Sequence, residues 1–265
     1  MLTRAVHIEI THGMSTDSFI LALQRFAARR GQPKKMVSDN GSNFRGAHNE
    51  LRRSLHAWST ARIEKFTSVR GIEWQFGPVA TSHWGGVWER MIRSVRKILY
   101  TISKGQVLTD ETLCTFMCEV ERILNNRPLT IVDDDSESLR PLTPAMLLLR
   151  REDYSECDGV LFSERLQHGW KRAQAMACSF WKRWKAEYLP TLQLRHRWQL
   201  KERPMQVGDL VIMRDEATAR NSWPLARVIK THAGTDGEVR QVTIRGVMGC
   251  KRVEIRRLCL LEGAS

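Results

Sequence analysis

An α/β fold class is predicted for this chain of 265 residues, with a long helix and a small β-barrel after the α/β part. Over residues 1–130, short stretches of alternating apolar residues alternate with stretches of helical period, as in a mixed sheet covered by helices. Over residues 202–262, several short apolar runs are separated by turn signals, which is typical of a small barrel. Two domains of different architecture are therefore expected.

The first strand is expected over residues 2–11, where Val6, Ile8 and Ile10 alternate with polar residues. A helix follows, capped by Ser15-Thr16-Asp17 and ended by Gly31-Gln32-Pro33. The later elements of this part are a short strand leading to Asp39, a helix over 47–66, a strand over 72–76, a helix from Trp88, and a helix from Thr109 to Asn125 before Pro128.

Two carboxylates stand where such elements end or begin. Asp39 follows Val37-Ser38 and precedes Asn40-Gly41, so it is expected at the tip of a strand. Glu89 lies in the first turn of a helix that follows Gly85-Gly86. Such a pair suits a two-metal site for phosphoryl transfer, because Mg²⁺ prefers oxygen ligands. By spacing alone, the alternative is that Asp39 caps a turn and Glu89 caps a helix.

Three motifs closely resemble the integrase core of BEL/Pao-type retrotransposons. They are Ser38-Asp39-Asn40-Gly41-Ser42-Asn43-Phe44, Ile72-Glu73-Trp74-Gln75-Phe76 and His83-Trp84-Gly85-Gly86-Val87-Trp88-Glu89-Arg90. The resemblance implies a ribonuclease-H-like core that integrates DNA by metal-dependent polynucleotidyl transfer. It implies that Asp39 and Glu89 are the second and third members of an Asp-Asp-Glu triad that binds Mg²⁺ or Mn²⁺.

The chain departs from this family at its start. The family carries its first catalytic Asp on an earlier strand, whereas Thr3–Ile10 resembles a later one, and neither Glu9 nor Asp17 matches the motif. The expectation is an incomplete core that lacks its first strands and is inactive in strand transfer by itself. Two hypotheses therefore stay open: a truncated integrase that retains Asp39 and Glu89, and a noncatalytic DNA-binding or assembly protein derived from one.

The formal charge of +13 makes nucleic acid the first partner to consider, with an anionic membrane surface second. On the helix after Gly86, Glu89, Arg93 and Arg96 share the arc opposite Met91, Ile92, Val95, Ile98 and Leu99. The alternative is a solvated, ion-paired face. The residues expected to contact DNA, in part by resemblance, are Asn40, Asn43, Arg90, Arg93, Arg96 and Lys97.

The second half of the chain divides into three expected segments. Residues 131–163 form a linker with a short helix at 145–149, and residues 164–201 form a basic helical segment whose helix Pro190 should end. Residues 202–262 hold the barrel, with a hairpin at Asp236-Gly237, and are expected to fold autonomously and bind nucleic acid. This stretch resembles the C-terminal domain of Src-homology-3 type that follows BEL/Pao integrase cores.

The six cysteines include no Cys-x-x-Cys pair, so neither a zinc site nor a disulfide framework is expected. Cys114 and Cys118 lie one helical turn apart in an apolar stretch and are expected in the core. No apolar run has the length of a membrane span, and no signal peptide is recognisable. The expectation is a soluble protein of the nucleus or cytoplasm that binds DNA and has no small-molecule cofactor. Association into a homo-oligomer is left open.

Overall fold

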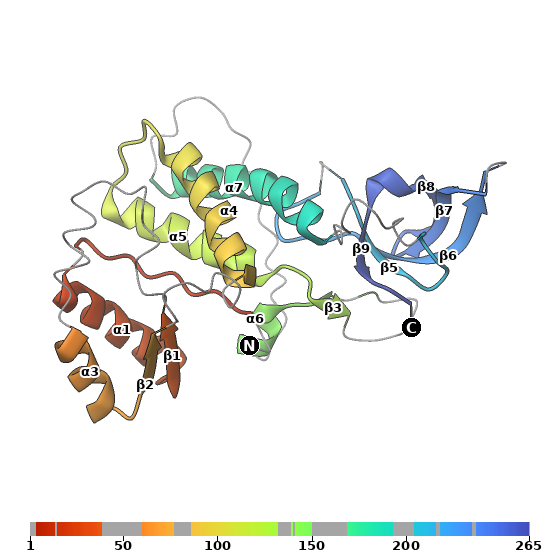
Figure 1. The fold of residues 1–265 in the computed structure, drawn as a ribbon. Coiled ribbons are helices and arrows are strands. Elements are labelled where there is room, and N and C mark those ends of the chain that lie inside the picture. Colours follow the sequence, from red (N-terminus) through yellow and green to blue (C-terminus); the bar gives the residue numbers. More distant parts are fainter. Residues whose placement is uncertain are drawn as a thin grey trace. The chain divides into compact units, whose positions relative to one another are not determined.

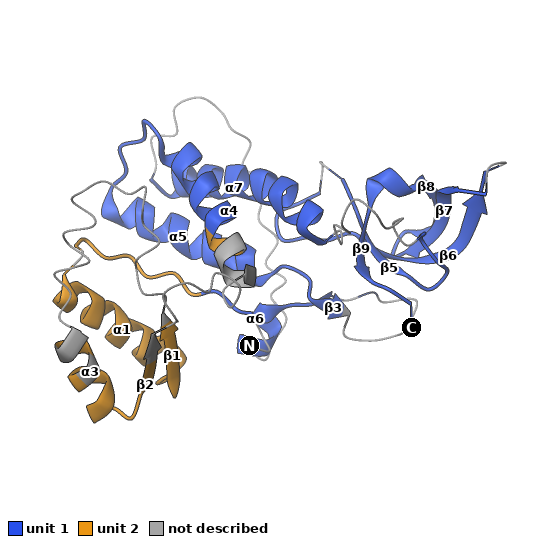
Figure 2. Cartoon of the chain, in the orientation of Figure 1, with its two compact units in different colours: residues 1–6, 93–265 blue, residues 7–92 orange. Residues whose placement is uncertain are grey.

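The computed structural model mixes helices and strands, which confirms the α/β expectation at that level (Figure 1). It describes residues 4–13, 15–38, 60–76, 86–131, 139, 141–149, 169–192, 204–215, 218–234 and 237–264. The chain divides into two compact units, residues 7–92 and residues 1–6 with 93–265 (Figure 2). Among the helices of the described ranges, none is long and apolar enough to span a membrane.

The described residues of the unit 7–92 include two complete helices and one strand pair. In chain order these are α1 (Thr16–Arg30), β1 (Lys35–Ser38), α3 (Thr60–Val69), β2 (Glu73–Phe76) and the start of α4 (Gly86–Ser103). The two strands pair in parallel, from Lys35↔Glu73 to Ser38↔Phe76. As predicted, α1 begins at a Ser15 cap, because Ser15 Oγ accepts a hydrogen bond from the Ser18 amide at 3.1 Å.

The strand expected over residues 2–11 is wrong for the described part of that segment. Residues 4–11 have no ladder partner there, and Arg4 has a φ of 46°. Side chains bind the backbone of the segment instead: Asn125 bonds Val6, and Arg25 Nη2 donates to the Ile10 carbonyl at 2.8 Å. An alternating pattern cannot by itself make a strand, because the backbone groups also need a neighbouring strand.

The other unit opens with helices. It contains the rest of α4, α5 (Asp110–Asn125), β3 (Thr130–Ile131), β4 (Pro141–Leu142), α6 (Pro144–Leu149) and α7 (Gly169–Leu192). Helices α5 and α7 lie side by side (Figure 1). The buried face of α5 carries Phe116, Val120, Ile123 and Leu124. Cys114 and Cys118 were expected in the core but are exposed, because each is two residues from Phe116 and so lies about 160° from it around the helix axis.

One predicted helix end is also wrong. Pro190 was expected to end the long helix, yet α7 continues through it to Leu192. A proline in the last turn removes a single backbone hydrogen bond, at an end where carbonyl groups already lack helical partners. The short helix α6 confirms the one expected near residues 145–149.

The C-terminal part is an antiparallel sheet of five strands. They are β5 (Leu210–Met213), β6 (Leu225–Ala233), β7 (Val239–Gly246), β8 (Gly249–Glu254) and β9 (Leu258–Glu262), with the 3-10 turn η1 (Ile255–Arg257) before β9. The order is β8-β7-β6-β5-β9, and β6 and β7 form the hairpin expected around Gly237. One face of the sheet buries Val211, Val228, Val242, Ile244 and Leu258.

The described residues form an open sheet rather than a closed barrel. Closure would require the end strands β8 and β9 to pair, and they do not do so in the part of the chain that the structure describes. The chain passes from β8 to β9 through η1, which carries β9 away to pair with β5. The predicted closed barrel is therefore corrected to an open antiparallel sheet over the described residues.

Candidate nucleic-acid interface

The predicted metal site lies largely outside the described residues. Asp39, Asn40 and Asn43 are not among them, and Glu89 and Arg90 are described only as backbone in the first turns of α4. The described side chains, which do not include Asp39 or Glu89, contain no group of three or more His, Cys, Asp or Glu that could bind a metal ion. Mg²⁺ or Mn²⁺ binding therefore stays a prediction.

Both acids that precede Asp39 in the sequence already have cationic partners within their own unit. Glu9 Oε2 lies 2.9 Å from Arg25 Nε, and Glu9 also pairs with Arg29. Asp17 Oδ1 lies 3.0 Å from Arg62 Nη2. Guanidinium groups hold these carboxylates in ion pairs, which compete with metal binding.

Helix α4 presents the expected cations on its exposed side. Arg93 and Arg96 are exposed, whereas Ile98 is buried, as the helical period predicts. Lys97 Nζ lies 2.5 Å from Glu187 Oε1 on α7, so this cation is ion-paired. Ile92 was expected on the apolar face but is 52% exposed. The α4 surface thus combines Arg93 and Arg96 with a lysine that is bound to another helix.

A second group of cations was not singled out from the sequence as one surface. It lies on the sheet face opposite the buried face, because neighbours of the buried Val242 and Ile244 on β7 must point the other way. We call it the cationic face and define it as Arg227, Lys230, His232, Arg245 and Arg252. Arg227 pairs in register with Arg245, and Thr243 pairs with Lys230 on one side and Arg252 on the other.

A β-bulge places Lys230 on this face. The register of β6 against β7 shifts between Val228 and Lys230, so one residue is skipped in the pairing. Without the shift, the strict alternation of a strand would put Lys230 on the same side as the buried Val228. Alternation read from the sequence therefore assigns Lys230 to the wrong side, and only the observed register reveals the surface.

His232 lies near two other cations of the cationic face, Lys230 and Arg252. Loss of solvation, and then the nearby Arg252 and Lys230, lower the pKa of His232 below its ordinary value. Its Nε2 lies 2.8 Å from Thr243 Oγ1. The guanidinium of Arg227 is positioned by a hydrogen bond, in which its Nη1 donates to the Gly208 carbonyl at 3.1 Å. The cations Arg252 and Lys230 are thus close enough to His232 to disfavour its protonated form.

The segment Asn125-Asn126-Arg127-Pro128, at the end of α5, connects distant parts of its unit. Asn125 Oδ1 accepts from the Val6 amide at 2.8 Å, and Asn125 Nδ2 donates to the Val6 carbonyl at 2.7 Å. The buried Arg127 donates to the carbonyls of Leu124, at 2.5 Å, and Arg4. Burial lowers the pKa of Arg127, and its two carbonyl partners satisfy part of its hydrogen-bonding capacity.

Aromatic side chains join the same segment to α7 and to the loop before β6. Trp223 Nε1 donates to the Asn126 carbonyl at 2.9 Å, and Tyr188 Oη donates to the Pro128 carbonyl at 3.2 Å. The ring of Trp223 meets those of Trp181 and Tyr188 edge to face, with centroids 4.9 and 5.7 Å away. Burial raises the pKa of Tyr188 to about 12. Trp181 and Trp184 of α7 thus pack internally, whereas Trp170 near its start is exposed.

A buried polar cluster adds to this junction. Arg220 Nη2 lies 2.5 Å from Gln174 Oε1 and 3.4 Å from Glu119 Oε2. Gln174 Nε2 in turn donates to Glu119 Oε1 at 3.0 Å. Residues of α5, α7 and the segment before β6 are thereby connected, because a buried guanidinium must be paired to be tolerated.

Comparisons with known proteins match a family model and solved structures. A family model described as "Family of unknown function (DUF5641)" matches residues 168–261, which run from α7 into β9. No curated protein matches this chain. Among solved structures, a chain of the simian T-cell lymphotropic virus intasome in complex with PP2A regulatory subunit B56 gamma aligns at 11% identity and a TM-score of 0.28. The alignment covers 95% of this chain and 65% of that chain, so this chain spans just under two thirds of its length.

Proposed function

We propose that this protein binds nucleic acid as an integrase-like protein of the BEL/Pao type, and that the cationic face of β6, β7 and β8 contacts the phosphate backbone. The observation that carries this proposal is the cross-strand register. It places Arg227 opposite Arg245, and Lys230 and Arg252 on the two sides of Thr243. A carboxylate, Glu254, lies farther along the face opposite Gln241.

Electrostatic cost favours a polyanionic partner for this arrangement. Like charges that lie directly opposite across a strand pair, as Arg227 and Arg245 do, destabilise a sheet. A phosphate backbone would relieve that repulsion and release counterions on binding. The whole chain carries a formal charge of +13, which adds a long-range attraction of the same sign.

The sequence motifs support the finer parts of the proposal. Their resemblance to integrase cores favours a ribonuclease-H-like core in which Asp39 and Glu89 bind Mg²⁺ or Mn²⁺. The strand order of the C-terminal sheet, with a three-residue 3-10 turn before its last strand, supports relationship to the Src-homology-3 type. DNA is the proposed partner in both parts.

Salt titration of duplex binding tests the cationic face. We expect Lys230→Ala with Arg245→Ala to reduce the slope of log K against log salt by about two, because each neutralised phosphate contributes about 0.9. The control, Lys182→Ala with Arg256→Ala, removes the same charge at exposed sites elsewhere and should leave the slope nearly unchanged. Equal losses in the two variants would show attraction to net charge alone and contradict the proposed surface.

A noncatalytic DNA-binding or assembly protein is the second candidate. It is favoured by the ion pairs of Glu9 and Asp17, which leave neither acid available as a third metal ligand without breaking a pair. Strand transfer by the purified chain with Mg²⁺ or Mn²⁺ is therefore expected to be undetectable, while duplex binding persists. Activity that Asp39→Asn abolishes would eliminate this candidate and show that another acid completes the site.

A further inference from the structure

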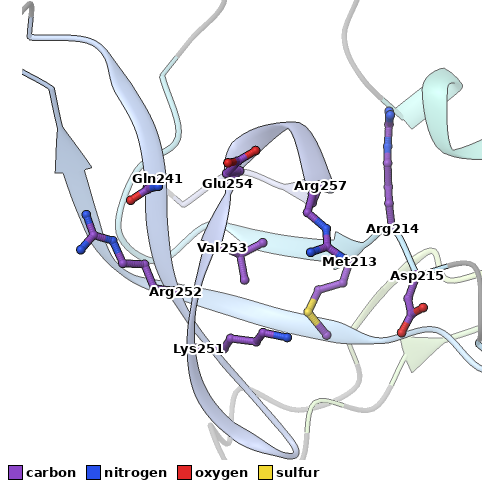
Figure 3. Close-up of a pocket in the computed structure, with 9 residues that line it drawn as sticks. All are labelled: Met213, Arg214, Asp215, Gln241, Lys251, Arg252, Val253, Glu254 and Arg257. Atoms are coloured by element: carbon purple, nitrogen blue, oxygen red, sulfur yellow. The ribbon is translucent and has the colours of Figure 1, made fainter.

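The C-terminal sheet contains a cavity of about 440 Å³ that shares Arg252 with the cationic face (Figure 3). Residues from β5, β7, β8 and η1 surround it. Met213 and Val253 supply apolar surface, and Met213 packs against the buried cluster of the sheet. A volume of this size lies within the usual range for pockets that bind small organic ligands.

Cations from β8, from η1 and from the segment just after β5 surround this apolar surface. They are Arg214, Lys251, Arg252 and Arg257. Arg214 is oriented by the sheet itself, since its Nε lies 3.1 Å from Cys259 Sγ and its amide donates to the Arg257 carbonyl at 2.8 Å. The side chains of Lys251 and Arg257 are exposed and make no hydrogen bond or ion pair within the described part of the chain.

Two carboxylates, Asp215 and Glu254, also line the cavity and leave it with a net positive charge. A bare anion would gain from the cations and be repelled by the carboxylates. A ligand that carries both a phosphate and hydrogen-bond donors, such as sugar hydroxyls, would suit both kinds of group. Gln241 adds an amide that can donate and accept.

We propose that this cavity binds one nucleotide unit, with its phosphate at Lys251 and Arg257 and its base or sugar against Met213 and Val253. The thioether and methyl groups of these residues offer the polarizable apolar contact that a base requires. The nucleotide is either free or part of a strand, and both sources share the same chemistry. This inference rests on the proposed function, because it assigns one subsite to the same nucleic-acid-binding sheet.

Titration with adenosine 5′-monophosphate tests the pocket. We expect calorimetric binding and a shift of the Met213 methyl resonance, while the fully exposed Met248 stays unchanged. Lys251→Ala and Arg257→Ala should each weaken binding about tenfold, because each removes a charged hydrogen bond. Arg256→Ala, at an exposed neighbour that does not line the cavity, should change it less than twofold. Equal weakening by Arg256→Ala would overturn the inference.

Two further probes decide the ligand and its source. Inorganic phosphate that binds as tightly as the mononucleotide would refute a nucleotide subsite. A 5′-phosphorylated hexathymidylate that competes with the mononucleotide would support a subsite for a strand, and simultaneous binding of both would support a free nucleotide.

The proposed function and this inference fail separately. Lys230→Ala with Arg245→Ala should flatten the salt dependence of duplex binding and leave mononucleotide binding within twofold. Lys251→Ala with Arg257→Ala should weaken mononucleotide binding and leave the salt dependence of duplex binding nearly unchanged. If wild-type protein binds duplex with the expected slope but no mononucleotide, only the inference of this subsection is wrong.

Discussion

The strand pair β1–β2 and the five-stranded sheet β5–β9 are both held by backbone hydrogen bonds between strands, but they differ in how much apolar core each supplies by itself. The two parallel strands have four residues each, and Val37 on β1 is 53% exposed. The antiparallel sheet buries its own cluster, including Val211, Val242 and Leu258, at exposures of 0%. Parallel strands usually need cover on both faces, whereas an antiparallel sheet can bury one face and expose the other.

The difference shows that the antiparallel sheet can present a polar binding surface on one face while the other face keeps its apolar core. In the antiparallel sheet, successive strands β6, β7 and β8 pair through short connections, so the core forms from neighbours in the sequence. The opposite face is then available for the cations Lys230, Arg245 and Arg252. The strands β1 and β2 are separated in the sequence by α3. Their pairing therefore needs packing contacts from residues that are not their neighbours in the sequence.

The largest expected effect concerns the attachment of the sheet to α7. Trp223→Ala should lower the free energy of unfolding by about 3–5 kcal/mol, because it removes a buried ring and leaves a cavity. The hydrogen bond from Trp223 Nε1 to the Asn126 carbonyl is lost as well. Urea denaturation followed by circular dichroism measures the change. Trp170→Ala, where the side chain is 60% exposed, is the control and should cost less than about 0.5 kcal/mol.

Fragments measure how independent the sheet is. Because the buried cluster lies within residues 205–260, residues 204–264 should unfold cooperatively by themselves. Residues 169–264 should be more stable by about 1.5–3 kcal/mol, because Trp223 is then buried against α7. Thermal melts of both fragments provide the comparison. A broad transition of the shorter fragment would remove the autonomy expected for residues 202–262.

A smaller effect is expected where the N-terminal segment joins α5. Asn125→Ala removes both bonds to the Val6 backbone and leaves those groups unpaired, at a cost of about 1–3 kcal/mol. Asn125→Asp keeps the acceptor but turns a buried carboxylate oxygen toward the Val6 carbonyl, so its cost in denaturant titrations at pH 7 should be at least that of Asn125→Ala. An unchanged stability in Asn125→Ala would mean that residues 4–6 do not depend on this side chain.

The α4 cations provide a test outside the sheet. Arg93→Ala with Arg96→Ala should reduce the slope of log K against log salt for duplex DNA by about one to two, similarly for all sequences. The control is Lys97→Ala, whose ammonium is ion-paired with Glu187 and should contribute less. An unchanged slope in the double variant would favour a solvated helix face and leave the cationic face of the sheet as the sharper hypothesis.

The smallest effect expected is the pH dependence from His232. Its pKa is lowered in the folded protein, so the unfolded chain binds a proton first as pH falls below about 6.5. Stability from this group is present above that pH and is lost as pH falls through the folded pKa. His232→Gln should therefore lose less stability than wild type between about pH 7.5 and 5 in thermal melts. Identical profiles would contradict a lowered pKa of His232 in the folded protein.

Local sequence determined the elements whose causes are themselves local. Caps at Ser15 and Thr109 start helices because their hydroxyl groups accept amides three residues later. Helical period predicted the buried face of α5 at Phe116 and Val120, and the signal at Gly237 predicted the hairpin. Asp39 and Glu89, chosen from motifs, remain predictions because the described side chains do not include them.

Tertiary structure alone decided the features that join distant residues. Asn125 occupies the backbone groups of Val6, which lies 119 residues away, so an alternating segment has no strand partner there. A bulge after Val228 turns Lys230 to the cationic face against simple alternation. Neighbouring residues encode period and capping, whereas backbone hydrogen bonds between segments and strand register depend on which surfaces meet. The sequence therefore predicted that the protein is basic, and the register decided where those charges lie on the sheet.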